Sequence, residues 1–354
     1  MNLLDEKRKE LGLKINDLAH KMEVDASLMS RILSGKRKPT ISQLKRLSEV
    51  LAIDYQVLLK AYLSQEIVTL LSPYSSIAES VLHVAEERIA YLTSNQKLEV
   101  ISFSKELQSI ITELDKKKLV WQSKKPLESI QLQKMKEYFN TAYTYESNRI
   151  EGNTLTLSET HLVVNEGVTI GGKSMREHLE VINHQEAIAL IYDFVERKIK
   201  LNPYYLKQIH AIVLNGIDKR NAGVYRNVPV RISGRKHMPP EPYLIEKLME
   251  DYFLFYETQK DTLHPVILAA EMHERLVSIH PFIDGNGRTS RLVMNLILLQ
   301  NGFTIVNLKG DLGDKLSYFR ALEAVQVNHE KEDFHRLIAK HALTSIDEHI
   351  ALAG

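Results

Sequence analysis

The 354-residue chain contains no cysteine. Disulfide bonds and thiolate metal sites are therefore excluded, and the composition fits a reducing cytosol. The 46 Lys and Arg nearly balance the 45 Asp and Glu, so the net charge of +1 gives the chain as a whole no bias toward nucleic acid or membrane. No apolar run approaches the ~20 residues that a transmembrane helix needs, and the charged start MNLLDEKRKELG lacks the apolar stretch of a signal peptide. We expect a soluble, cytoplasmic protein that does not bind membranes.

Alternating strand patterns are also scarce. Apolar residues instead recur with the 3.6-residue period of helices, as in LKRLSEVLAI (44–53), EAIALIYDFVERKI (186–199) and ILAAEMHERLVSIH (267–280). The best strand candidate is VPVRIS (228–233), which is followed by GRKHMPPEP and predicts a short hairpin or flap. The length predicts two or three domains, and the fold class is all-α.

Residues 1–65 read as a compact helical unit. INDLAHKME predicts one helix, VD a turn, and ASLMSRILSG a second helix that ends at Gly35. Residues 1–60 carry 12 Lys and Arg against 8 Asp and Glu, a net charge of +4, and Arg31 to Arg46 include six basic residues and no acid. On these residues alone, a DNA-binding unit and a small helical docking module with a basic edge both remain open.

LAHKMEVDASLMSRILSGKRKPT resembles the phage-repressor (Xre-like) helix-turn-helix family. The resemblance implies that the second helix enters the DNA major groove. The residues placed for base or backbone contact are Ser27, Leu28, Ser30 and Arg31, and those placed for phosphate contact are Lys36, Arg37 and Lys38. The family's turn glycine is Glu23 here, which is strained if its φ is positive.

Residues 66–135 contain no turn-rich linker. Charged helical stretches such as QKLEVISFSKELQSIITELDKKK dominate this part of the chain. We interpret it as a helical connector and a candidate surface for a homodimer.

GVTIGGKS (167–174) matches G-x-x-x-x-G-K-[ST], the phosphate-binding loop of nucleotide hydrolases. That loop needs a strand before it and a parallel sheet around it, whereas the preceding LSETHLVVNEG predicts a helix. We therefore expect a glycine-rich loop between two helices, with Lys173 exposed.

HPFIDGNGRTSR (280–291) concentrates reactive residue types between two predicted helices. Glycines and a helix N-terminus favour an anion, and two arginines three residues apart share one helix face, where they oppose the helix dipole unless an anion compensates them. Asp284 offers a hard oxygen to Mg²⁺, and His280 can accept a proton near neutral pH. These residues point to phosphate transfer from a Mg-nucleotide, without indicating which phosphorus is attacked.

The same stretch is similar to the full signature of the Fic family, H-x-F-x-[DE]-G-N-G-R-x-x-R, with every defined position matched. The resemblance spans roughly 137–340 and implies a Fic-fold helical domain, taken as 136–345, that transfers AMP from ATP to a Ser, Thr or Tyr hydroxyl of a target protein. His280 would be the general base and Asp284 would hold Mg²⁺. The other roles implied for these residues are phosphate binding by Gly285, Asn286, Gly287, Arg288 and Arg291, nucleoside contact by Tyr318 and Gln326, and alignment of the target by a flap of Val230, Arg231, Ile232 and Ser233.

TYESNRIEGNTLTL (144–157) resembles the inhibitory motif of this family, [ST]-x-x-x-E-[GN]. Ser147 and Glu151 lie four residues apart, on one face of a predicted helix near 140–152. From spacing alone Glu151 reads as a solvated glutamate. The resemblance implies instead that it pairs with Arg291 and displaces the γ-phosphate.

Several functions remain open at this point. The nearest alternative to AMP transfer is the reverse reaction, which removes AMP from a target. A regulator that binds DNA and senses nucleotide without chemistry is another, although a pure binding site needs no base such as His280. A phosphate-loop ATPase centred on Lys173 is the last.

Overall fold

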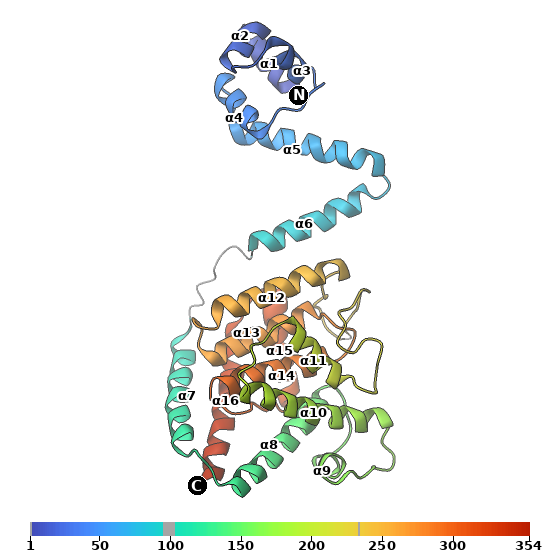
Figure 1. The fold of residues 1–354 in the computed structure, drawn as a ribbon, viewed down its shortest axis with the longest axis vertical. Coiled ribbons are helices and arrows are strands. Elements are labelled where there is room, and N and C mark those ends of the chain that lie inside the picture. Colours follow the sequence, from blue (N-terminus) through green and yellow to red (C-terminus); the bar gives the residue numbers. More distant parts are fainter. Residues whose placement is uncertain (1, 95–102, 233) are drawn as a thin grey trace. The chain divides into compact units, whose positions relative to one another are not determined.

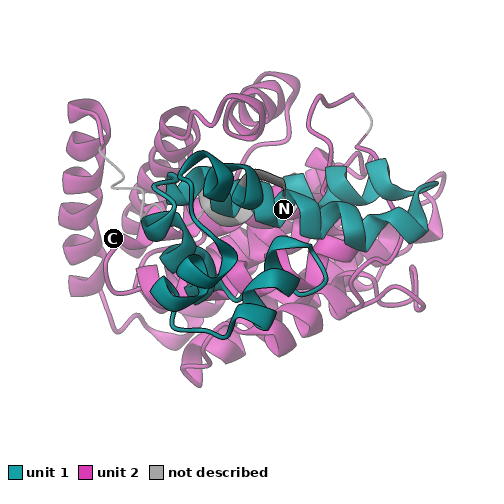
Figure 2. Ribbon diagram, turned by 90° about the horizontal axis from the view of Figure 1, so that it is seen from above, with its two compact units in different colours: residues 1–99 teal, residues 100–354 magenta. Residues whose placement is uncertain are grey.

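The computed structural model describes residues 2–94, 103–232 and 234–354. The chain forms two compact units, Met1–Glu99 and Val100–Gly354, drawn in different colours in Figure 2. Within the described residues every regular element is a helix, as Figure 1 shows, so the predicted all-α class is confirmed. In the same parts of the chain no helix is both long and apolar enough to cross a membrane.

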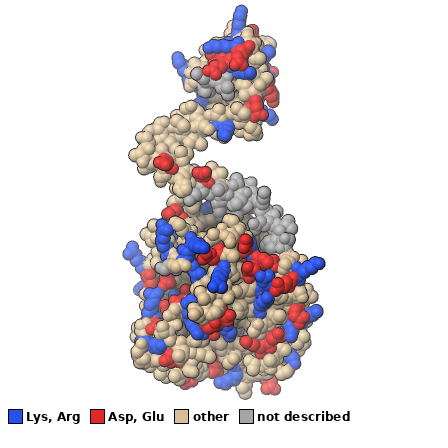
Figure 3. Space-filling model, turned by 180° about the vertical axis from the view of Figure 1, so that it is seen from behind, with Lys and Arg blue, Asp and Glu red and all other residues tan. Residues whose placement is uncertain are grey.

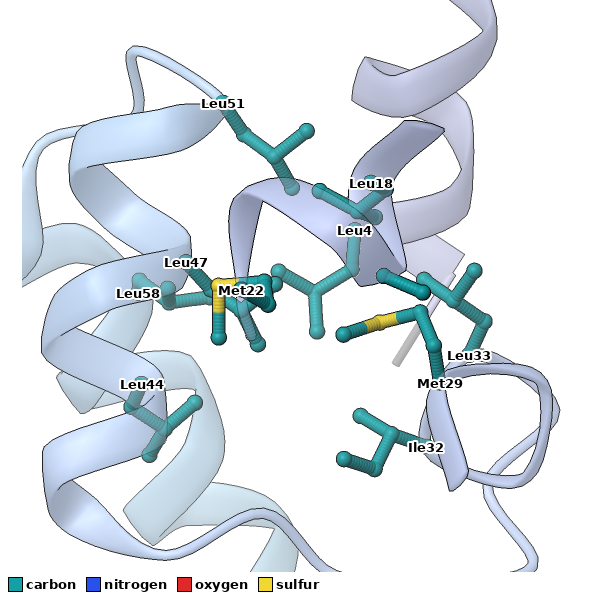
Figure 4. Close-up of a cluster of buried hydrophobic side chains, with 11 residues drawn as sticks. Leu4, Leu18, Met22, Met29, Ile32, Leu33, Leu44, Leu47, Leu51 and Leu58 are labelled. Carbon is teal, nitrogen blue, oxygen red and sulfur yellow. The ribbon is translucent and has the colours of Figure 1, made fainter. Parts of the chain in front are cut away.

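The first unit contains the predicted pair of helices. Its elements are α1 (Asn2–Glu10), α2 (Ile15–Lys21), α3 (Ala26–Leu33), α4 (Ile41–Val50), α5 (Tyr55–Leu71), η1 (Ser72–Tyr74) and α6 (Ala78–Ser94). The Asp25 side chain accepts hydrogen bonds from two backbone amides of the first turn of α3, which is why that helix starts there. Leu18, Met29, Leu47 and neighbouring side chains from α1 to α5 converge on one core, shown in Figure 4.

The second unit is a larger helical bundle. Its elements are α7 (Lys105–Ser123), α8 (Ser129–Ile150), α9 (Leu157–Glu166), α10 (Met175–Glu196), α11 (Pro203–Val213), η2 (Pro242–Leu244), α12 (Ile245–Gln259), α13 (Pro265–Ile279), α14 (Asn286–Gln300), α15 (Leu312–Asn328) and α16 (Glu332–Ala353). Lys and Arg intermingle with Asp and Glu over the face of this unit drawn in Figure 3.

Helices α13 and α14 form the centre of this bundle. Every residue from Leu292 to Leu298 is buried, so α14 is covered on all sides. It packs against α10, α11 and α13, and α13 also packs against α12 and α16. Because α14 is buried in this way, the polar residues of its first turn are held in place by the bundle.

Helix α7, which lies within the predicted connector, packs along α16. Its Trp121 is buried and meets the ring of His349 edge-on, with 5.5 Å between the ring centroids.

Candidate active site

The loop between α13 and α14 is shaped by two residues in the left-handed backbone region. Helix α13 ends at His280 with φ 51°, and Gly285 with φ 77° precedes α14. The Asn286 side chain accepts a hydrogen bond from the Phe282 amide at 3.0 Å and donates one to the Phe282 carbonyl at 2.9 Å. Asn286 therefore uses its side chain to close the loop, which leaves only its backbone amide for an anion at the helix start.

His280 is held as a neutral imidazole. Burial is the main reason that its pKa is lowered to about 4; Arg226 acts in the same direction, and the Val277 carbonyl and Glu151 act against it. Nδ1 lies 3.3 Å from the Val277 carbonyl oxygen, to which a proton on Nδ1 can be donated. In that tautomer Nε2 is unprotonated, and His280 is a base at neutral pH.

Both arginines of the signature are buried at the start of α14, with exposed fractions of 2% for Arg288 and 1% for Arg291. Arg288 meets carboxylates only at long range: Nη1 is 3.4 Å from Glu180 Oε1, and Nη2 is 3.5 Å from Asp284 Oδ1. Its Nε and Nη1 have no hydrogen-bond partner among the described residues. Buried donors of this kind are costly unless an acceptor satisfies them, so the site is suited to an anion.

Glu151 caps the C-terminus of α8, and its carboxylate lies over the start of α14. Oε1 accepts a hydrogen bond from Arg291 Nη2 at 2.7 Å, and a Cβ added to Gly287 would collide with the same oxygen. Burial would raise the pKa of Glu151, but Arg291 and Arg288 outweigh burial and hold the pKa below its usual value. An ionised carboxylate thus occupies the position that favours an anion.

Ser147 completes this contact from one turn earlier in α8. Arg291 Nε donates to Ser147 Oγ at 2.9 Å, and Nη2 donates to the Ser147 carbonyl at 2.9 Å. The guanidinium is therefore fixed by three acceptors from the same short segment.

Asp284 is a single ionised carboxylate at the mouth of the site. Burial would raise its pKa, but Arg288, the Gly285 amide and Arg176 together hold the pKa below its usual value. Its side chain is 40% exposed, and the described residues contain no cluster of three or more His, Asp or Glu that would hold a metal ion by themselves. This donor set fits Mg²⁺, which usually binds through one or two carboxylates together with substrate phosphates.

Two residues that sequence reasoning missed hold this loop in place. His210 of α11 stacks on Phe282 at 3.6 Å between ring centroids, and its Nε2 donates to the Asp284 carbonyl at 2.8 Å. Arg226, which is 4% exposed, donates from Nε to the His280 carbonyl at 2.8 Å. Neither residue belongs to a recognisable motif, so the sequence contained no signal for them.

The two residues predicted to contact the nucleoside lie on α15. Tyr318 is 3% exposed, and its hydroxyl lies 2.9 Å from His273 Nε2. Gln326 donates to Ser278 Oγ at 3.0 Å, two residues before His280. Both side chains thus contact α13 near the predicted base.

The predicted flap is a loop. Among the described residues no strand is present, so the expected hairpin pairing is not observed at Val230, Arg231 and Ile232; Ser233 lies outside the described residues. The loop is fixed at its base by Arg226, which donates to the Val228 carbonyl at 3.1 Å and to the Pro240 carbonyl at 2.5 Å.

A cavity of about 490 Å³ is lined by this loop and by α15. Arg235 and Lys236 line it on the loop side, and Phe319 and Arg320 line it on the helix side. The Arg235 guanidinium carbon lies 3.4 Å from the centroid of the Phe319 ring. Burial lowers the pKa of Arg235, and the charge of Glu151 is among those that oppose this effect.

The segment GVTIGGKS lies between α9 and α10, as predicted, and no strand precedes it. The expectation that Lys173 is exposed was wrong, since only 20% of its side chain is exposed. Its Nζ donates to the Thr154 carbonyl at 2.6 Å and lies 3.7 Å from Glu159. Lys173 therefore holds the segment that follows Glu151.

The predicted DNA contacts lie on and after α3. Ser27, Ser30 and Arg31 are exposed on the helix, whereas Leu28 is half-buried against the core. After the helix Lys36, Arg37 and Lys38 are exposed, and Lys38 pairs with Glu66 of α5 at 2.6 Å.

The turn before α3 contains a strained residue. Glu23 has φ 53°, the left-handed conformation in which glycine is favoured, and its carboxylate pairs with Arg46 at 2.5 Å. The helix-turn-helix geometry thus forms without the glycine of the resembled family.

Comparisons with known proteins give the same two domains. The model of the Fic/DOC family matches residues 200–298, and a helix-turn-helix family model matches residues 4–58. A protein adenylyltransferase Fic of Nematostella vectensis is 37% identical over 225 residues, which cover 61% of this chain and 51% of that protein. The relative from Drosophila yakuba, with the same name, is 36% identical over 190 residues, which cover 53% of this chain and 38% of that protein. The chain thus spans about half of the first relative and less of the second.

Solved structures also resemble this chain. A Fic-domain-containing signaling protein from Bacteroides thetaiotaomicron is 27% identical with a TM-score of 0.62, and the match covers 69% of this chain and 97% of that one. A fragment of Fic-1 from C. elegans is 26% identical with a TM-score of 0.62, and 92% of each chain is covered. The chain therefore contains a Fic/DOC-family domain, preceded by a helix-turn-helix domain.

Proposed function

We propose that the second unit transfers AMP from MgATP to a hydroxyl of a target protein and that Glu151 restrains this activity. One observation carries the proposal: the Glu151 carboxylate lies over the start of α14, held by buried Arg291, beside an imidazole whose pKa is lowered to about 4. An anion site next to a neutral base is what attack on a phosphorus requires. The names of the two relatives reported above agree with this reaction.

The reaction balances with the groups at hand. Nε2 of His280 accepts the proton of the target hydroxyl as its oxygen attacks the α-phosphorus. The bond from the α-phosphorus to the oxygen that bridges to the β-phosphate breaks, and pyrophosphate leaves. The product is a phosphodiester between AMP and the target, and general-base help of this kind contributes ~10²–10⁴-fold.

The start of α14 would hold the phosphates. We assign the α- and β-phosphates to the backbone amides of Gly285, Asn286 and Gly287 and to Arg288, whose buried donors lack hydrogen-bond partners in the described residues. Arg291 would hold the γ-phosphate once Glu151 has left it. Arginine is suited to this role because its fork binds two phosphate oxygens at once.

Asp284 would hold Mg²⁺, the cation that accompanies ATP. When bound, the metal neutralises phosphate charge and orients the leaving group. The lowered pKa of Asp284 keeps its carboxylate ionised for this purpose.

The cavity between α15 and the loop is our candidate for the nucleoside. Because its Arg235 lies over the Phe319 ring, a base would stack on the outer face of this pair. Tyr318 and Gln326 would support the nucleoside site indirectly, since both contact α13 and neither lines the cavity.

The target would align along the loop. Val230 and Ile232 are half-buried and Arg231 is exposed, an alternation typical of extended backbone. We propose that Val230, Arg231, Ile232 and Ser233 pair with an extended segment of the target by strand addition.

Replacement of His280 tests the proposed chemistry. The full chain is incubated with ATP labelled at the α-phosphorus and with cell lysate, and label on protein is measured. His280→Ala should lose ~10²-fold or more of the transfer while it still binds ATP, because it removes a proton acceptor and no phosphate contact. The exposed His329 offers a matched control, and His329→Asn should label like the parent. Unchanged labelling by His280→Ala would refute the role of the base.

We further propose that the first unit binds DNA in the cytoplasm. The exposed positions of Ser27, Ser30 and Arg31 on α3 support contact with base edges, and Lys36 and Arg37 support contact with phosphates. The ion pair of Lys38 with Glu66 would have to open before Lys38 could contact a phosphate.

A homodimer would suit this role, because helix-turn-helix proteins commonly bind two half-sites as dimers. Apolar side chains are exposed on α5, on α6 and in the turn between them, among them Leu63, Ile67, Leu70, Ile77 and Leu82. We propose that this surface pairs with a second copy. Light scattering on the full chain tests it: the parent should be a dimer and Leu70→Glu a monomer, and a monomeric parent contradicts the proposal.

A further inference from the structure

Asp284 is already paired with a cation of the protein. Arg176, the second residue of α10, donates from Nη2 to Asp284 Oδ2 at 2.5 Å. The other carboxylate oxygen, Oδ1, accepts from the Gly285 amide at 2.6 Å. Both oxygens of Asp284 are therefore in use, and Arg176 occupies Oδ2.

The Arg176 guanidinium is held in position by a residue of the same helix. Its Nε donates to Glu180 Oε1 at 3.2 Å, one turn further along α10. Glu180 is 9% exposed, and its Oε2 accepts from the Asn153 side chain at 3.0 Å, so this anchor is fixed from a second segment. Arg288 lies near the same two carboxylates, 3.4 Å from Glu180 and 3.5 Å from Asp284. Two arginines and two carboxylates thus form a cluster with no net charge.

The members of this cluster differ in how readily they can move. Arg288 is buried in the bundle, whereas 58% of the Arg176 side chain is exposed. An exposed arginine regains water when it leaves its partner, so its ion pair opens at little cost. Arg176 is therefore the member that a competing cation can displace.

We infer that Arg176 is the resting counter-cation of Asp284 and that a divalent cation arriving with nucleotide binds Asp284 only by displacing it. The inference rests on the proposed function, which assigns Mg²⁺ to Asp284. It adds a second restraint to the site. Glu151 neutralises Arg291, the proposed ligand of the γ-phosphate, and Arg176 neutralises Asp284, the proposed ligand of the metal. The consequence is that Arg176 reduces the gain in nucleotide affinity that the metal provides.

The test measures binding alone. An ATP analogue with a methylene group between the α- and β-phosphorus cannot transfer AMP, and its affinity is measured by calorimetry with Mg²⁺ and with EDTA. The ratio of the two affinities reports how strongly the metal supports the nucleotide. Arg176→Gln should raise that ratio by about three- to tenfold over the parent, the range expected when one competing ion pair is removed. Arg176→Lys, which keeps the charge, should stay closer to the parent.

Two further variants make the result unambiguous. Arg197 lies in the C-terminal cap of the same helix and pairs with Asp193 at 3.1 Å, in an exposed contact outside the cluster. Arg197→Gln is the matched control and should leave the ratio unchanged. Asp284→Asn should bring the ratio close to one.

Three results would overturn the inference. If Asp284→Asn lowers the ratio but Arg176→Gln leaves it unchanged, Arg176 does not compete with the metal and the proposed function stands. If Arg176→Gln weakens binding equally with and without metal, Arg176 contacts the nucleotide instead. If Asp284→Asn leaves the ratio unchanged, the assignment of Mg²⁺ to Asp284 is wrong, and the inference fails with that part of the proposed function.

Discussion

Replacement of Glu151 by glycine should raise the proposed transfer of AMP. The carboxylate accepts a hydrogen bond from Arg291 at 2.7 Å, and the guanidinium is 1% exposed. A charge-assisted hydrogen bond is worth ~1.5–3 kcal/mol, which corresponds to about a tenfold to hundredfold shift between two nucleotide poses. We therefore expect Glu151→Gly to raise AMP transfer, including self-modification, by well over tenfold.

Intact mass spectrometry with MgATP measures the gain as AMP units added to the chain. Glu151→Gln removes the charge but keeps a side chain of the same length, so it should give part of the activation. Glu137 lies half-buried on the same helix and pairs with Lys134, so Glu137→Gln is a matched control that should stay silent. Arg291→Ala should cancel the gain of Glu151→Gly, with circular dichroism used to confirm that the double variant folds.

If Glu151→Gly stays as silent as the parent against itself and against lysate, restraint by Glu151 is wrong. If the parent removes AMP from proteins and Glu151→Gly loses that activity, the reverse reaction takes the place of AMP transfer.

Three further predictions concern DNA, pH and the strained turn. The full chain should bind a specific DNA operator with an affinity that falls steeply as the salt concentration rises, and Arg31→Ala should weaken specific binding more than non-specific binding. Gel shifts across a genomic library measure this, and the absence of a preferred site would favour a docking module. Because burial lowers the pKa of His280 to about 4, and the base acts when neutral, the transfer rate should stay level between about pH 5 and 7 and fall only as the pH approaches 4; a step near the ordinary histidine pKa of 6.5 would contradict this. Glu23→Gly should raise the Tm of fragment 1–65 by about 4–8 °C, because glycine accepts φ 53° without strain; an unchanged or lower Tm, measured by circular dichroism, would show that the pair with Arg46 matters more.

The elements that local sequence determines could be predicted well. Capping residues and apolar periodicity placed α2, α3, α13 and α14 within a few residues of where they lie. The contact of Glu151 with Arg291 could be expected only through the resemblance, because 140 residues separate the two.

The remainder of the site depends on long-range packing. His210 and Arg226 reach the loop from segments that carry no motif, and Arg176 follows the GVTIGGKS segment, whose glycines and lysine do not indicate a contact with Asp284. The hairpin pairing is not observed for a related reason: the alternating residues indicate extended backbone, but strand pairing needs a partner, and none is present for the described residues of the flap. The roles of the individual site residues remain predictions.

The position of the label on the product tests the central claim most directly. Glu151→Gly is incubated with ATP labelled either at the α-phosphorus or at the γ-phosphorus, and label on protein is measured for each. AMP transfer predicts that protein retains the α label, that the γ label appears in pyrophosphate, and that His280→Ala in the same chain abolishes both. Protein that carries the γ label, or α label that persists without His280, would contradict the account.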